Sequence, residues 1–177
     1  IIGSCRYKNE PVGVDEVELM KKSSLVSLLK EYKKCLRIIK QNRRPDKDTV
    51  LVNFGTVDYQ AGGFINRWLK ELGIAQELVI EEDSEGLGFR LFLKKEKHSI
   101  TSLADEGRGI TQVVLILLQI EVAIMQKKIS RTGYCNDFTV CIDHPTLAIE
   151  EPEVSLHPCW QSKLAEIFVD ASKHGVH

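Results

Sequence analysis

Apolar residues recur at intervals of three and four along two long stretches of the chain, which is the period of an α-helix. In the first stretch, residues 15–42, no Pro or Gly interrupts the pattern, and Pro45 ends it. In the second stretch the apolar side chains share one face: Leu156, Trp160, Leu164, Ile167, Phe168 and Ala171. We therefore predict a helix over 15–42 and a final helix that begins near Pro158.

Two further helices are predicted between these stretches. Residues 64–72 form the shorter one, and Gly73 is its expected C-terminal cap because glycine readily adopts the left-handed conformation needed there. The longer one runs from Gly109 to about Lys127 and is apolar nearly all round. Such a helix is expected to be buried against several neighbours rather than one.

Short apolar runs with the length of β-strands lie between the helices. They cover residues 49–54, 77–82, 89–93, 138–142 and 146–149. Residues 83–86 have the composition of a hairpin turn, and residues 99–108 are predicted to be a polar loop. Because strands alternate with helices, the pattern indicates an α/β fold.

Composition narrows the class of protein. The 177 residues include 24 Lys and Arg against 25 Asp and Glu, and 43% are hydrophobic, which is typical of a globular protein. The five cysteines form no CxxC pair, so neither a zinc site nor a disulfide framework is predicted. The longest apolar run, residues 113–118, is far shorter than the about 20 residues that cross a bilayer. We expect a cytoplasmic protein with no membrane partner.

Two adjacent carboxylates follow the apolar run at 146–149. In an open α/β fold, ligands bind at the carboxyl ends of parallel strands. One of these carboxylates, Glu150 or Glu151, can hold Mg²⁺, which prefers oxygen ligands, and the adjacent one can orient and polarise a water that attacks a γ-phosphate. Pro152 then ends the strand. The alternative is an exposed acidic turn that binds no ligand.

A glycine loop precedes the long apolar helix. Gly107, Arg108 and Gly109 stand where backbone N–H groups at a helix N-terminus can approach an anion closely. The Arg108 guanidinium can add a charge-assisted contact to a phosphate. Taken alone, this spacing of glycines also fits a simple tight turn.

The acidic pair and its surroundings resemble a known motif. Residues 147–153 (Leu-Ala-Ile-Glu-Glu-Pro-Glu), with Leu156, His157, Pro158 and Gln161, are similar to the Walker B and D-loop region of ABC-type ATPases. The similarity is greatest to the soluble group that includes the overcoming-lysogenization-defect nucleases, retron-associated ATPases and structural-maintenance-of-chromosomes-like proteins. In this family the pattern is an apolar strand, two acids, Pro-Glu, and Leu-His-Pro at the start of a helix.

The glycine loop resembles the signature loop of the same soluble family, Asp-x-Gly-x-Gly-x-x-Gln before an apolar helix, which is matched here at 105–112. In the family this loop contacts the γ-phosphate held by a partner subunit. The resemblance implies ATP contacts by Gly107, Arg108, Gly109, Thr111 and Gln112. Transporter-type loops carry Ser where Gly107 stands, which disfavours a transporter's nucleotide-binding domain.

The resemblance covers residues 64–177 and implies the distal half of a P-loop NTPase fold of the ABC type. We divide the chain into a helical, basic segment at 1–60 and the signature-loop and Walker B portion at 61–177. The implied cofactors are ATP and Mg²⁺, with Glu151 as the catalytic residue and Glu150 as the metal ligand. The implied assembly is a homodimer joined through its nucleotide sites.

The implied activity is ATP hydrolysis that controls DNA processing or an effector protein, with antiphage defence as one such role. The sequence contains no Gly-x-x-x-x-Gly-Lys-[Ser/Thr] loop to cradle the α- and β-phosphates, and no switch histidine at the family's position. We expect that loop to lie upstream in a longer protein, and the chain alone not to hydrolyse ATP. The alternative is a non-catalytic nucleotide-dependent scaffold or protein-interaction module. His157 is expected to cap or pack at the start of the last helix.

Positive charge is concentrated between residues 21 and 44. Against the single acid Glu31 stand nine basic residues: Lys21, Lys22, Lys30, Lys33, Lys34, Arg37, Lys40, Arg43 and Arg44. Such a stripe can follow a phosphate backbone, so DNA is a candidate partner. The alternative is an ordinary solvated helix face.

Overall fold

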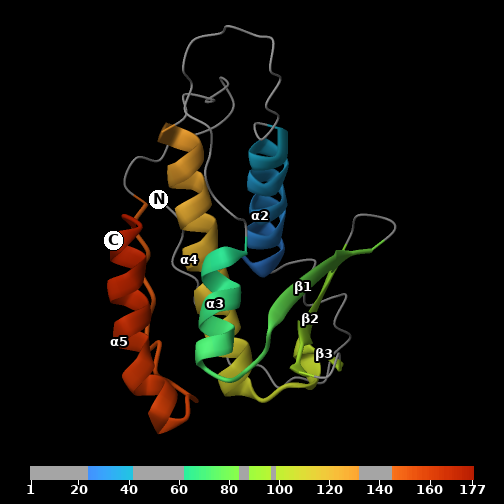
Figure 1. The fold of residues 1–177 in the computed structure, drawn as a ribbon, viewed down its shortest axis with the longest axis vertical. Helices are drawn as coiled ribbons and strands as arrows, with labels where there is room; N and C mark the ends of the chain where they lie inside the picture. Colours follow the sequence, from blue (N-terminus) through green and yellow to red (C-terminus); the bar gives the residue numbers. More distant parts are fainter. Residues whose placement is uncertain (1–23, 42–61, 84–87, 97–98, 132–144) are drawn as a thin grey trace, which may run out of the picture.

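A computed structural model describes residues 24–41, 62–83, 88–96, 99–131 and 145–177, and over these the chain is a mixed α/β protein (Figure 1). The helices are α2 (Ser24–Gln41), α3 (Gly63–Glu71), α4 (Arg108–Arg131) and α5 (Pro158–Lys173). The strands are β1 (Glu77–Glu82), β2 (Phe89–Lys94) and β3 (Ile100–Ser102), followed by the short 3-10 helix η2 (Leu103–Asp105).

The predicted helices agree with this structure wherever it describes them. Helices α3, α4 and α5 confirm three of them, and α2 confirms the helix at 15–42 from Ser24 onward. Residues 15–23, and the runs predicted as strands at 49–54 and 138–142, lie outside the described residues. Apolar periodicity was sufficient here because each of these helices buries one face or more.

The strands form one antiparallel sheet in the order β1–β2–β3. The predicted strands at 77–82 and 89–93 are confirmed as β1 and β2, with Glu77 opposite Lys94 and Glu82 opposite Phe89. The loop predicted at 99–108 is wrong in part, because β3 and η2 lie within it. The described sheet is also not the parallel one expected beside the acidic pair. Short connections between consecutive strands favour antiparallel pairing, which hydrophobic periodicity does not reveal.

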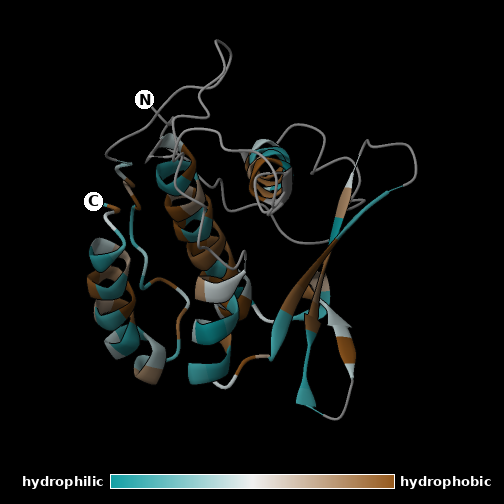
Figure 2. Cartoon of the chain, turned by 45° about the horizontal axis from the view of Figure 1, so that its top comes forward, coloured by the Kyte–Doolittle hydropathy of each residue, from teal (hydrophilic) through white to brown (hydrophobic). Residues whose placement is uncertain are grey.

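Helix α4 lies at the centre of the described structure. The side chains of Val114, Leu117 and Leu118 have no exposed surface, and α2 and α3 both pack against this helix. Figures 1 and 2 show α5 running beside it as well. By length and hydropathy alone, Arg108–Ser130 could cross a membrane, but 67% of its apolar window is buried inside the structure. This burial fits the core helix that the sequence predicts.

Helix α3 ends at the glycine that the sequence assigns as its cap. Gly73 has a φ of 67°, its N–H donates to the Lys70 carbonyl (3.0 Å), and the Ile74 N–H donates to the Leu69 carbonyl (2.9 Å). This pair of hydrogen bonds defines a Schellman motif, in which the residue after the helix must be left-handed. The chain then turns directly into β1.

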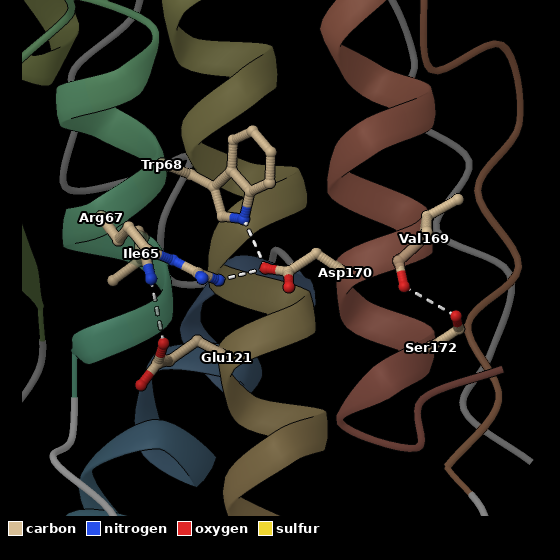
Figure 3. A network of polar contacts seen from close by, with 7 residues as sticks. All are labelled: Ile65, Arg67, Trp68, Glu121, Val169, Asp170 and Ser172. Carbon is tan, nitrogen blue, oxygen red and sulfur yellow. Dashed lines mark hydrogen bonds and ion pairs between the residues drawn. The ribbon is translucent and has the colours of Figure 1, made fainter.

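The start of α3 is held by a buried carboxylate from α4. The fully buried Glu121 accepts hydrogen bonds from the N–H groups of Gly62 (2.7 Å) and Ile65 (3.1 Å), the second of which is drawn in Figure 3. The first N–H groups of a helix have no partner within the helix, and an acidic group there also interacts favourably with the helix dipole.

The charge of Glu121 also acts on Tyr32 of α2. Burial raises the pKa of the Tyr32 hydroxyl to about 12, and the negative charge of Glu121 adds to that rise.

Side-chain contacts join α3 and α4 to α5. The Asp170 carboxylate pairs with the Arg67 guanidinium and accepts a hydrogen bond from Trp68 Nε1 at 3.0 Å (Figure 3). Beyond the end of α5, the buried Lys127 of α4 donates from Nζ to the Gly175 carbonyl oxygen at 2.9 Å. Helix α5 is therefore fixed in its last turn and just past its C-terminal end.

We expect Glu121→Gln to lower the free energy of unfolding by about 2 kcal/mol, because one buried N–H of the α3 N-terminus loses its acceptor and the other loses a charged one. The measurement is urea unfolding followed by circular dichroism. Glu71→Gln removes the same charge from an exposed position at the end of α3 and should change stability by less than about 0.5 kcal/mol. Equal losses in the two variants would contradict the assignment of Glu121 as the α3 cap.

Candidate functional site

The glycine loop lies at the exposed N-terminus of α4. Gly107 and Arg108 are exposed, and the N–H groups of Ile110 and Thr111 both donate to the Gly107 carbonyl (3.0 and 3.2 Å). No atom lies within 4 Å of where a Cβ on Gly107 would stand, so the backbone at Gly107 is open to an approaching group. Thr111 is half-buried, and its hydroxyl lies 3.5 Å from the same Gly107 carbonyl. Gln112 follows one position later and is half-buried.

Glu106 anchors this loop to the sheet. Its carboxylate lies 2.6 Å from Lys95 Nζ and accepts a hydrogen bond from the Thr101 hydroxyl at 2.8 Å. The hydrogen bond from Lys95 lowers the pKa of Glu106 below its usual value, burial opposes this shift, and the Thr101 hydroxyl adds to the lowering. The residue directly before Gly107 is therefore held by one side chain just after β2 and one within β3, which restricts where the loop can go.

The acidic pair lies on an exposed turn. Glu150 and Glu151 are both exposed, and Glu151 has a left-handed φ of 47°. Ser155, near the end of the same turn, is also left-handed, with a φ of 65°. This conformation costs a non-glycine residue roughly 1–2 kcal/mol, so surrounding contacts must hold it. Backbone strain of this kind is concentrated at binding and catalytic sites in proteins.

Hydrogen bonds and one buried side chain hold the turn. The Val154 N–H donates to the Glu151 carbonyl and the Leu156 N–H to the Glu153 carbonyl, each at 3.1 Å. Gln161 Nε2, from α5, lies 3.3 Å from both the Glu153 and the Leu156 carbonyl oxygens. Leu156 is buried in the core. Gln161, which the family resemblance singles out, thus positions the turn in this structure.

The glycine loop and the acidic turn are in direct contact. A Cβ on Gly109 would stand 2.6 Å from the Ser155 carbonyl oxygen and 3.7 Å from the Cα of Leu156. No side chain fits at that distance, so glycine is required at position 109 for the close approach of two backbones. The two motifs that the sequence analysis identified separately therefore form one surface at the N-terminal end of α4.

The segment before the acidic pair is extended, but it is not a full strand as predicted at 146–149. The Leu147 N–H donates to the His177 carbonyl (2.6 Å), and the His177 N–H donates to the Pro145 carbonyl (2.9 Å). His177 thus forms hydrogen bonds to both Pro145 and Leu147, which are two positions apart. This is the hydrogen-bond pattern of a parallel β-pair. Helix α5 lies between the two paired segments in sequence and forms their crossover.

His157 behaves as expected at the start of α5. It is the N-cap residue, and its Nδ1 accepts a hydrogen bond from the Cys159 N–H at 3.3 Å. Pro158 follows at the first position of the helix, where its missing N–H costs nothing. The prediction that His157 caps the helix is confirmed.

The exposed carboxylates could bind a magnesium ion only together with further ligands from a nucleotide. No group of three or more His, Cys, Asp or Glu side chains that could hold a metal is present among the described residues. Mg²⁺ bound together with nucleotide phosphates needs only one or two protein carboxylates, and Glu150 can supply one. The nucleotide's α- and β-phosphates need a cradle that this sequence does not contain.

Sequence reasoning missed three side chains that position these motifs. Glu106 and Lys95 form an ion pair across sequence-distant elements, which no local pattern predicts. Lys127 holds the turn after α5 and thereby the pairing of His177. Lys127 stands directly beside Lys128, so no signal in the sequence marked it as buried. Glu121 did carry such a signal, since it is the only charged residue between Arg108 and Lys127 and a buried charge requires a partner.

Within the described part of the basic helix, half-exposed Lys33 is paired with the sheet. Lys33 pairs with the Glu82 carboxylate of β1, and its Nζ lies 5.0 Å from the centre of the Phe89 ring. The continuous stripe expected from the sequence is therefore interrupted at Lys33. Lys30, Lys34 and Arg37 are exposed.

Comparison with known proteins does not assign this chain to a family. No protein-family model, no curated protein and no solved structure matches it.

We expect Gly109→Ala to lower the free energy of unfolding by about 1–3 kcal/mol, because the new methyl group displaces the Ser155 backbone. Gly107→Ala makes the same chemical change two positions earlier, where nothing lies within 4 Å, and should change stability by less than about 1 kcal/mol. Chemical denaturation of both variants checks the prediction. Similar losses at the two positions would show that the glycine loop does not pack on the acidic turn.

The ion pair at Glu106 should make stability depend on acid. The folded-state pKa of this carboxyl lies below its ordinary value of 4.5, so the pair stabilises the fold above that pH and loses its effect as pH falls through the lowered pKa. Glu106→Gln should therefore destabilise the chain at pH 7 and approach wild-type stability as pH falls below 4.5. Thermal melts from pH 7 to pH 3 measure the difference, with the exposed Glu96→Gln as control. A difference that stays constant with pH argues against the ion pair.

Proposed function

We propose that the chain is the signature-loop and Walker B portion of a soluble ABC-type ATPase, with a P-loop NTPase fold completed by segments outside these 177 residues. The observation that carries the proposal is the contact between Gly109 and Ser155. It joins a glycine-rich helix N-terminus to a strained turn with two exposed carboxylates. An anion-binding helix terminus beside such carboxylates suits a nucleotide with its metal ion.

The roles of the individual residues follow from their exposure and neighbours. Glu151 polarises the attacking water, and Glu150 helps to hold Mg²⁺, which supplies charge neutralisation at the phosphates. Gly107, Arg108 and Gly109 offer backbone N–H groups and a guanidinium to the γ-phosphate of a nucleotide held by a second subunit. Thr111 and Gln112, both half-buried, support the first turn of α4 behind that contact.

The exposure of Gly107 and Arg108 supports a site completed by a second copy of the protein. In the proposed homodimer each glycine loop meets the nucleotide bound by its partner, so nucleotide binding closes the dimer. The protein is cytoplasmic in this proposal, and closure controls the processing of DNA or an attached effector protein, including in antiphage defence. Since the phosphate-binding loop is missing from the sequence, the chain by itself is inactive.

A second candidate is a nucleotide-dependent scaffold that binds without turnover. The observation that favours it is the exposure of both Glu150 and Glu151. Enzymes often bury a catalytic acid or base in the active site. In the described structure, by contrast, both carboxylates are in contact with solvent. In this alternative, dimerisation and partner binding do not depend on Glu151.

We expect Glu151→Gln to reduce Mg-ATP hydrolysis by the natural full-length protein at least about 100-fold, because the water loses its polarising carboxylate. Glu153→Gln neutralises another exposed carboxylate on the same turn and serves as the matched control, with activity within about threefold of wild type. Hydrolysis is measured as phosphate release, with the 177-residue chain tested in parallel and expected to be inactive. Equal activity of wild type and Glu151→Gln removes Glu151 from its role, and no hydrolysis by either favours the scaffold.

A further inference from the structure

Helix α2 has one buried apolar face and one exposed basic face. Val26, Leu29, Cys35 and Ile39 are buried in the common core with residues of α3 and α4. Figure 2 shows the helix nearly end-on, with its hydrophilic positions gathered on one side. The exposed residues of α2 whose side chains are described are Ser27, Lys30, Lys34 and Arg37. We refer to Lys30, Lys34 and Arg37 as the basic face.

The structure separates Lys30 and Arg37 from Lys33 and Glu31, while Lys34 forms a long ion pair with Glu31. Lys33 points to β1, where the Glu82 carboxylate neutralises it. Glu31 lies at the seam between α2 and α4, where its Oε1 is 3.3 Å from Gln126 Nε2 and 3.7 Å from Lys34 Nζ. That ion pair at 3.7 Å is half-exposed, so its attraction is weak and leaves the Lys34 ammonium accessible. The exposed side of α2 is thus a row of three positive charges, and Glu31 lies beside this row, at the seam with α4.

We propose that the basic face of α2 binds the phosphate backbone of a double-stranded nucleic acid. At 1.5 Å per residue, Lys30 and Arg37 lie about 10 Å apart along the helix, the axial rise of about three nucleotides in one strand of a duplex. The three cations stand on a rigid helix, which keeps their spacing. Each can neutralise one phosphate and release its counterion.

Features of the same helix disfavour two other polyanions. Single-stranded nucleic acid is generally bound by aromatic side chains that stack on bases, and the exposed positions of the described part of α2 include no aromatic residue. An interfacial membrane helix inserts its apolar face into lipid, but the apolar face of α2 is buried in the protein core. A duplex backbone needs only the accessible charges.

This binding is independent of the proposed ATPase activity, so it is tested without nucleotide. The probe is a fluorescent 25-base-pair DNA duplex of mixed sequence, and anisotropy is measured at several salt concentrations. For the unsubstituted chain, log affinity should fall with log salt with a slope of about −2.7, the value for three phosphate contacts. The triple variant Lys30→Gln, Lys34→Gln, Arg37→Gln should lose at least about tenfold in affinity at low salt, with a slope near zero.

The matched control removes the same number of charges elsewhere. Lys70, Arg90 and Lys173 are exposed on α3, β2 and α5, and their replacement by Gln lowers the net charge equally. This control should keep affinity within about threefold and keep the salt slope. Thermal melts of both triple variants confirm that they fold.

Three outcomes overturn the proposal. They are the absence of duplex binding by the unsubstituted chain, equal losses in the two triple variants, and tighter binding to a single-stranded oligonucleotide or to phosphatidylserine vesicles than to the duplex. A parallel titration with an RNA duplex of the same sequence identifies which kind of backbone is preferred. Because no nucleotide is present, failure here leaves the ATPase proposal untouched, and loss of ATPase in Glu151→Gln leaves this one untouched.

Discussion

The described structure depends most on a single buried carboxylate, Glu121, in the middle of an apolar helix. Desolvating a carboxylate is costly, and two N–H groups at the start of α3 offset part of this cost by donating to it. Those N–H groups lack partners within their own helix. The same hydrogen bonds therefore satisfy both the carboxylate of α4 and the N–H groups of α3. It ties α3 to α4, and the Schellman turn at Gly73 then directs the chain into the sheet.

Helix α4 carries this constraint to the candidate site. Its middle holds α3 through Glu121, while Lys127 near its end holds the Gly175 carbonyl and so the segment that pairs with Leu147. Its first turn packs Gly109 against Ser155. One rigid, buried helix, α4, therefore holds the acidic turn near Ser155 and the segment that pairs with Leu147. Because α4 is buried in the core, it fixes where the glycine loop and the acidic turn lie.

In the candidate site, the groups available to a ligand are exposed, and the groups that support the backbone are buried or paired. Glu150, Glu151 and Arg108 face solvent, where a ligand or a second subunit can reach them. The groups that hold the backbone are buried or paired: Leu156 in the core and Glu106 on Lys95 and Thr101. Strain at Glu151 is sustained because neighbouring contacts over-determine the turn. Helix α2 is divided in the same way, with its apolar face in the core and its basic face outward.

Local chemistry was enough to predict the described helices, the antiparallel strands β1 and β2 and the cap at Gly73, because each depends on residues a few positions apart. The motifs at 105–112 and 147–153 stay predictions. Strand direction, the partner of Glu121 and the orientation of Lys33 could not be predicted in this way. Glu121 meets Gly62 across 59 positions and Lys33 meets Glu82 across 49. Such contacts depend on which elements pack together, and no local period encodes that. The sequence alone determined which groups are available for chemistry, while the tertiary structure decided which of them meet, because burial forces distant charges and backbone groups to find partners.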